Sequence, residues 1–142
     1  MKMSEKFCLK WNDFQSAVSQ AFKKLQLESD FNDVILVSED DVQISAHKVV
    51  LSASSGFFKR ILQNHPHKNT LLFLGGVSSI DLGFILDYIY CGEVKLYQGQ
   101  LDGFLESAKK LEIEGLFDLH QERTHSSDEQ DNDDSIDDLP PT

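Results

Sequence analysis

One stretch, Phe31 to Gln63, constrains the fold of this chain more than any other. An apolar run from Val34 to Val37 leads through an acidic connection, Ser38 to Asp41, into a segment from Val42 to Ala46 in which apolar and polar residues alternate. Alternation with a period of two is typical of a strand with one buried face, and apolar residues at helical spacing then run from Val49 to Leu62. The pattern predicts a strand, a hairpin turn, a strand and a helix.

The residues that follow predict more strands and helices in alternation. A polar loop at 65–69 precedes a predicted strand, and Ser78 and Gly92 sit where the N-cap and the left-handed C-cap of a helix belong. The predicted elements are a strand at Thr70–Leu74, a helix from Ser78 to Cys91, a short strand at Glu93–Tyr97, a helix at Leu101–Leu111 and a last short helix at Gly115–Gln121. Together they predict an α/β core over residues 31–122.

A separate strand and helix precede this core. Residues 1–6 are polar and are expected to be flexible, whereas residues 7–11 alternate, with Phe7, Leu9 and Trp11 on one face and Cys8 and Lys10 on the other. This alternation predicts a short strand with no hairpin partner beside it in the sequence.

The helix of this N-terminal arm, defined as residues 7–30, is expected to run to about Leu27. Asn12 and Gln15 have the spacing of a capping box. Its apolar face consists of Phe14, Val18, Ala21, Phe22 and Leu25. Either the arm packs on its own domain, or its strand pairs with a sheet edge of another subunit, because an unpaired strand leaves a row of backbone donors and acceptors open.

The charge of the chain is concentrated at its C-terminal end. Residues 126–142 hold seven acidic residues and no basic one, and so contribute −7 of the formal net charge of −11. Their composition predicts that residues 123–142 are a disordered acidic tail or linker. Neither residues 1–125 nor the acidic tail has the clustered Lys/Arg face that binding to phosphate backbones needs, so we expect no direct nucleic-acid contact.

The sequence lacks the residue patterns of an enzyme or a metal protein. It contains no G-x-S-x-G elbow, no P-loop and no dinucleotide-binding glycine pattern. Cys8 and Cys91 lie far apart, and His65 and His67 have no further ligand in register, so no metal site and no cofactor are expected. No apolar run has the length of a membrane span or signal peptide, which favours a soluble intracellular protein.

One polar cluster is predicted near the end of the sheet. Asp33 opens the first strand of the core, and His47 and Lys48 open the helix after the second. In the structural interpretation His47 is satisfied at the helix start, and Asp33 forms a partly buried ion pair with Lys48. In the functional interpretation Asp33 and Lys48 form a charged pocket at a subunit boundary, where complementary charge sets specificity and register.

At these residues the sequence resembles a BTB (POZ) domain. The resemblance rests on four ordered blocks, F-N-D-V-I-L at 31–36, I-S-A-H-K-V-V-L-S-A-S-S-G-F-F at 44–58, F-I-L-D-Y-I-Y-C-G-E-V at 84–94 and L-E-S-A-K-K-L-E-I-E-G-L at 105–116. The arm segment F-C-L-K-W-N-D-F-Q at 7–15 is similar to the N-terminal segment of the insect tramtrack group, from which Lys10 and Asp13 depart. Lys10 lacks the bidentate fork of the arginine usual at its position.

The resemblance implies a BTB fold, a small mixed sheet flanked by helices, that forms homodimers through its first helix. It further implies larger assemblies, often hexamers built from dimers, and places Asp33 and Lys48 at the charged-pocket positions of the family. Family members are commonly parts of nuclear transcription or chromatin regulators that associate with other BTB domains and corepressor-type proteins. The alternative use of the fold is as a substrate adaptor of a cullin-type ubiquitin ligase, which the acidic tail after residue 123 disfavours because adaptors usually continue into helices.

Overall fold

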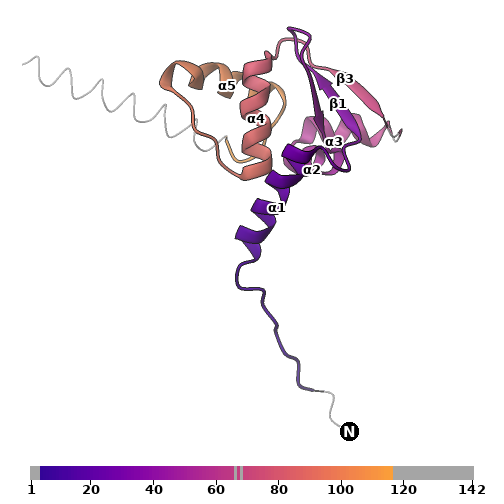
Figure 1. Cartoon of the computed structure of the whole chain (residues 1–142), viewed down its shortest axis with the longest axis vertical. Coiled ribbons are helices and arrows are strands. Elements are labelled where there is room, and N and C mark those ends of the chain that lie inside the picture. Colours follow the sequence, from indigo (N-terminus) through magenta and orange to yellow (C-terminus); the bar gives the residue numbers. More distant parts are fainter. Residues whose placement is uncertain (1–3, 66, 68, 117–142) are drawn as a thin grey trace, which may run out of the picture.

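The segment Phe31–Gln63 forms one side of the body of the domain, and the helix Ser79–Cys91 lies between it and the helix Gln98–Lys110 (Figure 1). The computed structural model describes residues 4–65, 67 and 69–116. In chain order its elements are α1 (Phe14–Glu28), β1 (Val34–Val37), β2 (Gln43–Ala46), α2 (Lys48–Ser54), α3 (Gly56–Gln63), β3 (Thr70–Phe73), α4 (Ser79–Cys91) and α5 (Gln98–Lys110). This is the predicted α/β architecture, a small mixed sheet flanked by helices.

The sheet has the strand order β2-β1-β3. The hairpin pairs β1 antiparallel with β2, so that Val34 lies opposite Ala46, whereas β3 runs parallel to β1 and places Thr70 opposite Val34. A parallel pair requires a long crossover connection, which α2 and α3 supply. Val34 and Leu36 are fully buried on one face of the central strand. Backbone hydrogen bonds with Ala46 and Thr70 hold Asp33 directly before β1.

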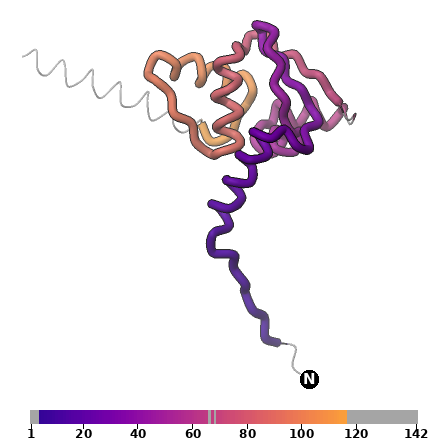
Figure 2. Tube along the Cα trace, viewed as in Figure 1, coloured from indigo at the N-terminus to yellow at the C-terminus, as the bar shows by residue number. Residues whose placement is uncertain are grey.

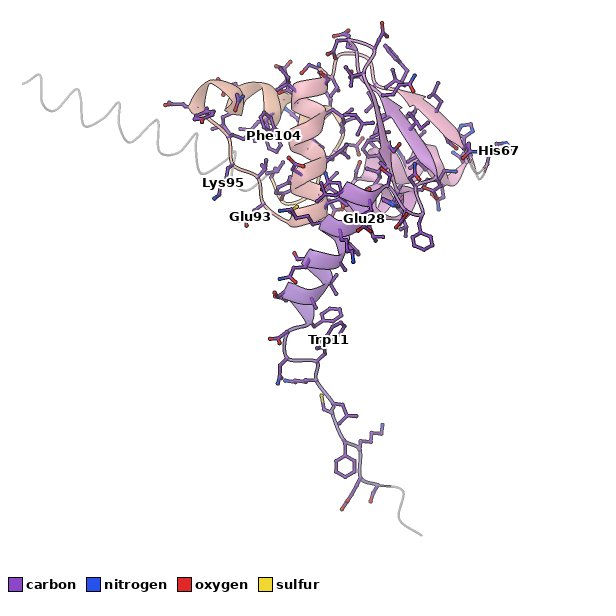
Figure 3. All side chains as sticks on the ribbon, viewed as in Figure 1. Trp11, Glu28, His67, Glu93, Lys95 and Phe104 are labelled. Carbon is purple, nitrogen blue, oxygen red and sulfur yellow. The ribbon has the colours of Figure 1, made fainter. Side chains whose placement is uncertain are left out.

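The core is built mainly by side chains from the helices. Leu51 of α2, Phe58 of α3, Leu82 and Ile85 of α4 and Phe104 of α5 are buried against one another and the sheet. Figure 3 shows Phe104 pointing from α5 toward α4. Ser78 caps α4 by accepting a hydrogen bond from the backbone N–H of Asp81, and Gly92 closes the helix with a left-handed φ of 82°. Both predicted caps are confirmed.

The single helix predicted from Val49 to Leu62 is wrong, because the chain breaks at Ser55. Ser55 has an extended backbone, with φ −148° and ψ 124°, and forms an isolated antiparallel bridge with Ile113. Its hydroxyl accepts from the N–H of Phe58 as the N-cap of α3 and donates to the carbonyl of Leu111. Apolar spacing continues through the break because both helices face the same core, which explains why periodicity did not reveal it.

Two predicted strands have no counterpart in the described part of the chain. Residues 7–11 form no sheet pairing there, and Glu93–Tyr97 is an irregular segment rather than a strand. Side chains in the latter still alternate, since Val94 and Leu96 are half-buried while Glu93, Lys95 and Tyr97 are exposed. Alternation of apolar and polar residues indicates which side chains are buried. A β-strand also requires a neighbouring strand with which its backbone forms hydrogen bonds.

The arm leads away from the body of the domain, as the trace in Figure 2 makes clear. Helix α1 begins one residue later than a cap at Asn12 would give, and its N-cap, Asp13, makes no side-chain capping bond. The predicted capping box of Asn12 and Gln15 is therefore wrong. Most of the predicted helix at Gly115–Gln121 and the acidic tail at 123–142 lie outside the described residues. No helix in the described ranges has the length and apolar character to cross a membrane.

Candidate assembly surface and charged pocket

Helix α1 presents its apolar face largely to solvent. None of its residues is buried. Val18 and Leu25 are half-buried, whereas Phe14, Ala21 and Phe22 are exposed. The helix lies against α4, where the side-chain amide of Gln26 donates to the carboxylate of Asp87 at 3.0 Å. We call the side chains of Phe14, Val18, Ala21, Phe22 and Leu25 the α1 stripe.

Ahead of α1 the predicted strand residues are more exposed still. Phe7, Leu9 and Trp11 expose 83%, 94% and 62% of their surface, and Cys8 and Lys10 are also exposed. Figure 3 shows Trp11 far from the body of the domain, where α1 begins. Its ring meets that of Phe14 edge to face, with 5.3 Å between centroids. The interpretation that the arm strand packs on its own domain therefore does not hold in this structure.

Asp33 and Lys48 come together at the start of α2, but not as an ion pair of side chains. The carboxylate of Asp33 accepts a hydrogen bond from the backbone N–H of Lys48 at 2.8 Å, as a helix cap does. The ammonium group of Lys48 instead donates to the carbonyls of His65 and His67. Both residues are half-buried, so the charged groups remain partly accessible.

His47 is buried and fully hydrogen-bonded. Its Nε2 lies 2.5 Å from the carbonyl oxygen of Asp30, which can only accept, so Nε2 carries the proton. Nδ1 then accepts from the hydroxyl of Tyr90 at 2.7 Å, and that hydroxyl also accepts from the backbone N–H of His47 at 3.0 Å. Burial raises the pKa of Tyr90 to about 12, with a smaller contribution from the charge of Asp33.

Tyr90 and Asp30, the partners of His47, were not predicted from the sequence. Tyr90 lies in an apolar helix and has the spacing of a core residue, and Asp30 contributes only its backbone carbonyl. No sequence signal identifies a backbone carbonyl as a hydrogen-bond partner. Tyr90 is buried, with its ring among the core side chains of α4.

An apolar hollow of about 380 Å³ lies beside the Glu93–Tyr97 segment. Its walls come from that segment, from α4 and α5, and from Leu116. The main apolar lining residues are Val94, Leu96, Leu101, Phe104, Leu105 and Leu116. Glu93 also lines the hollow, whereas Figure 3 shows Lys95 pointing outward from the segment. Within the ranges that the structure describes, no three His, Cys, Asp or Glu side chains gather as metal ligands.

Comparison with known proteins gives one consistent family. The family model for the BTB/POZ domain matches residues 22–128. The chain is 43% identical over 116 residues to the longitudinals lacking protein-like of Drosophila melanogaster, covering 82% of this chain and 91% of that protein. It is 39% identical over 124 residues to the alpha isoform of tramtrack from the same organism, covering 87% of this chain and 15% of tramtrack.

The Broad-complex core protein of Drosophila melanogaster is 40% identical over 126 residues, which cover 89% of this chain but 17% of that protein. Among solved structures, the BTB domain of zebrafish PATZ1 matches with a TM-score of 0.71 at 20% identity, over 85% of this chain and 99% of that one. The BTB domain of human gigaxonin matches with a TM-score of 0.65 at 22% identity, over 76% and 88%. The fold and the matched sequence agree: this chain belongs to the BTB/POZ family of protein-interaction domains.

Proposed function

We propose that this BTB domain associates with copies of itself as the assembly module of a nuclear transcription or chromatin regulator. Helix α1 forms the homodimer contact, and residues 7–11 join dimers into a larger particle, a hexamer built from dimers. The domain contacts no DNA itself. Other BTB domains and corepressor-type proteins are its further partners, and Asp33 and Lys48 form part of the boundary that they meet.

The exposed α1 stripe is the observation that carries this proposal. A helix of 15 residues with no buried side chain gains little from its own domain, yet it presents Phe14 and Phe22 to solvent. Contiguous apolar surface of this kind marks an interaction site, and a two-fold axis lets one stripe cover the same stripe of a second copy. Burying each large apolar side chain of the stripe stabilises the dimer by roughly 1.5–3 kcal/mol, before the entropy lost when two copies associate is subtracted.

The N-terminal segment supports the larger assembly. Residues 7–11 alternate like a strand but have no partner among the described residues, and Glu93–Tyr97 alternates in the same way beside an apolar hollow. We infer that residues 7–11 of one copy add alongside Glu93–Tyr97 of another, where backbone hydrogen bonds give affinity and the hollow takes an apolar side chain. This pairing would give both segments the strand partner that neither has among the described residues.

Assembly acts on DNA binding through effective concentration. The curated relatives Broad-complex and tramtrack extend well beyond the region that this chain matches, and such additional regions would carry the DNA contacts. Joining several weak DNA-binding modules strengthens their binding by roughly 10² to 10⁴ without any new contact to DNA. The proposed function of this domain is therefore to raise the valency of the protein that contains it.

Deletion of residues 1–11 tests the role of the segment, and deletion of residues 1–6 is the matched control. We expect the shorter deletion to leave the mass of the particle unchanged. The longer one should leave a folded dimer, because α1 and the core are intact while the residues proposed to join dimers are gone. Light scattering over a range of concentrations measures both masses.

An unchanged mass after removal of residues 1–11 would show that the segment joins no dimers. A shift to monomer would instead assign the segment to the dimer contact. Circular dichroism of each variant establishes that the core remains folded in either case.

A further inference from the structure

The orientation of α1 relative to the core is only weakly set by packing. The helix has no buried residue, and the hydrogen bond between Gln26 and Asp87 that joins it to α4 is exposed to water. An exposed side-chain hydrogen bond contributes little, since water competes for both groups. A helix that presents a dimer surface nevertheless needs a defined direction, so another restraint must act where α1 joins the core.

That junction contains two residues in left-handed backbone conformation. Ser29 has φ 57° and Phe31 has φ 63°, on either side of Asp30. A bulky side chain such as phenylalanine rarely adopts this conformation, which persists only where surrounding contacts enforce it. The side chain of Phe31 is 86% exposed, so its own packing does not enforce the turn. The restraint must come from the backbone on either side of it.

The pair His47 and Tyr90, which we call the clasp, provides such a restraint. The buried imidazole donates from Nε2 to the carbonyl of Asp30, inside the left-handed turn. Tyr90 fixes the ring, because its hydroxyl donates to Nδ1 and accepts from the N–H of the same residue. Three residues after Asp30, the N–H of Asp33 donates to the carbonyl of Ala46, where the sheet begins. The turn is thus held at its centre by the clasp and at its end by the sheet.

We propose that His47 and Tyr90 are positioning residues for self-association, which set the direction of α1 by holding the carbonyl of Asp30. The proposal rests on the proposed function, because direction matters only if α1 forms an interface. None of the hydrogen bonds of the clasp involves a residue of the α1 stripe. It acts through the turn at residues 29–31, and its loss loosens the helix while the core keeps its fold.

The test uses Tyr90→Phe in the full chain, with Ser55→Ala as a matched control. Each substitution removes one buried hydroxyl that makes two hydrogen bonds. The hydroxyl of Ser55 bonds to the backbone of Phe58 in α3 and of Leu111, and makes no bond to the turn before β1. Spin labels at Ser16→Cys in α1 and Lys59→Cys in α3, with Cys8→Ser and Cys91→Ala, report the distance between the arm helix and the core. Labelled chains are diluted into excess unlabelled chains so that distances within one chain are read.

We expect Tyr90→Phe to broaden the distance distribution and to weaken dimerisation roughly tenfold, the effect of about one net hydrogen bond. Ser55→Ala should lower the thermal stability about as much as Tyr90→Phe does, but should leave the distance distribution and dimerisation unchanged. His47→Gln, which keeps an amide donor within reach of Asp30, should retain a narrower distribution than His47→Ala. It also serves as the test if Tyr90→Phe does not fold.

Equal distributions in the Tyr90 and Ser55 variants, or in the Gln and Ala variants, would overturn the clasp. A wild-type chain that stays monomeric at every concentration overturns the proposed function instead. In that case the distance distributions still decide whether the clasp directs α1.

Discussion

The carboxylate of Asp33 accepts a hydrogen bond from the first backbone N–H of α2, so this side chain acts as a cap for the helix. Asp33→Ala should lower the free energy of unfolding by about 1 kcal/mol, the usual effect of losing a cap. Asp33→Asn keeps an acceptor oxygen and should lose less, while removing the charge that a partner would meet. Urea unfolding measures the first effect, and partner binding per folded molecule measures the second.

Asp41→Asn is the control for the two Asp33 variants, because Asp41 is exposed and asparagine tolerates its left-handed φ of 65°. If Asp33→Asn destabilises the fold as much as Asp33→Ala and binding per folded molecule is unchanged, the role of Asp33 is structural alone.

Asp40 makes the stability depend on acid. Hydrogen bonds from the hydroxyl of Ser79, and then from that of Ser38, lower the pKa of Asp40 from 3.8 to about 2. The native state therefore binds this proton more weakly than the unfolded state, so the stabilisation is present above about pH 4 and is lost as the pH falls toward 2. Ser79→Ala should shrink this effect.

The measurement is urea unfolding of wild type and Ser79→Ala from neutral pH down to about 2. The difference between their free energies of unfolding should be constant near neutrality and diminish in acid. Ser45→Ala, at an exposed position in β2, should show a difference that does not vary with pH. A pH-independent difference for Ser79→Ala as well would mean that this hydroxyl does not govern Asp40.

At the scale of elements, α1 offers a test in which stability and assembly separate. Phe22→Asp places a charge in the α1 stripe at an exposed position, so the free energy of unfolding of the monomer should change by less than about 1 kcal/mol. Dimerisation should fall by a factor of more than roughly 100, because an unpaired charge would be buried at the contact. Sedimentation at several concentrations measures it.

Gln20→Asp introduces the same charge at a polar, exposed position of the same helix. It should leave the dimer intact. Equal weakening by both variants would indicate that charge alone, rather than burial of the stripe, governs association.

Most of the helices and strands could be predicted from the sequence alone, but some of their boundaries and pairings could not. The alternation and helical spacing of Phe31–Gln63 predicted β1, β2 and the helical region that follows, and Ser78 and Gly92 marked the ends of α4. The break at Ser55 could not be predicted, because it depends on Leu111, a residue far along the chain. Predicted pairing also failed for Glu93–Tyr97, because backbone pairing depends on what lies alongside.

The candidate site was only partly predictable for the same reason. The predicted hairpin placed Asp33, His47 and Lys48 at the same end of the sheet, and the structure brings them together there. The expected ion pair is replaced by a backbone cap, and the partners of His47 are a tyrosine hydroxyl and a carbonyl. Several hydrogen-bond partners are equally compatible with the sequence, and the tertiary contacts determine which of them is used.

At the scale of the whole molecule, charge opposes assembly while apolar surface favours it. With a formal net charge of −11, copies repel one another at low ionic strength. We expect light scattering to show a mass above that of a dimer, and added salt to increase the assembled fraction by screening this repulsion. Concentration-independent monomer or dimer mass would contradict the larger assembly.

A chain ending at residue 125 lacks seven acidic residues and should depend less on salt. If both chains respond equally, the repulsion arises within the folded domain rather than in the acidic segment.

The central position of β1 has a consequence for how the domain folds. Its contacts with β2 are local, whereas Val34 meets Thr70 only after α2 and α3 have crossed the sheet. Closing so long a loop costs entropy before any parallel contact forms, so the hairpin should appear early and β3 late. During synthesis the arm leaves the ribosome before either, and its exposed phenylalanines then have no finished core beside them. If α1 forms the proposed dimer contact, these side chains are covered only after a second copy has folded.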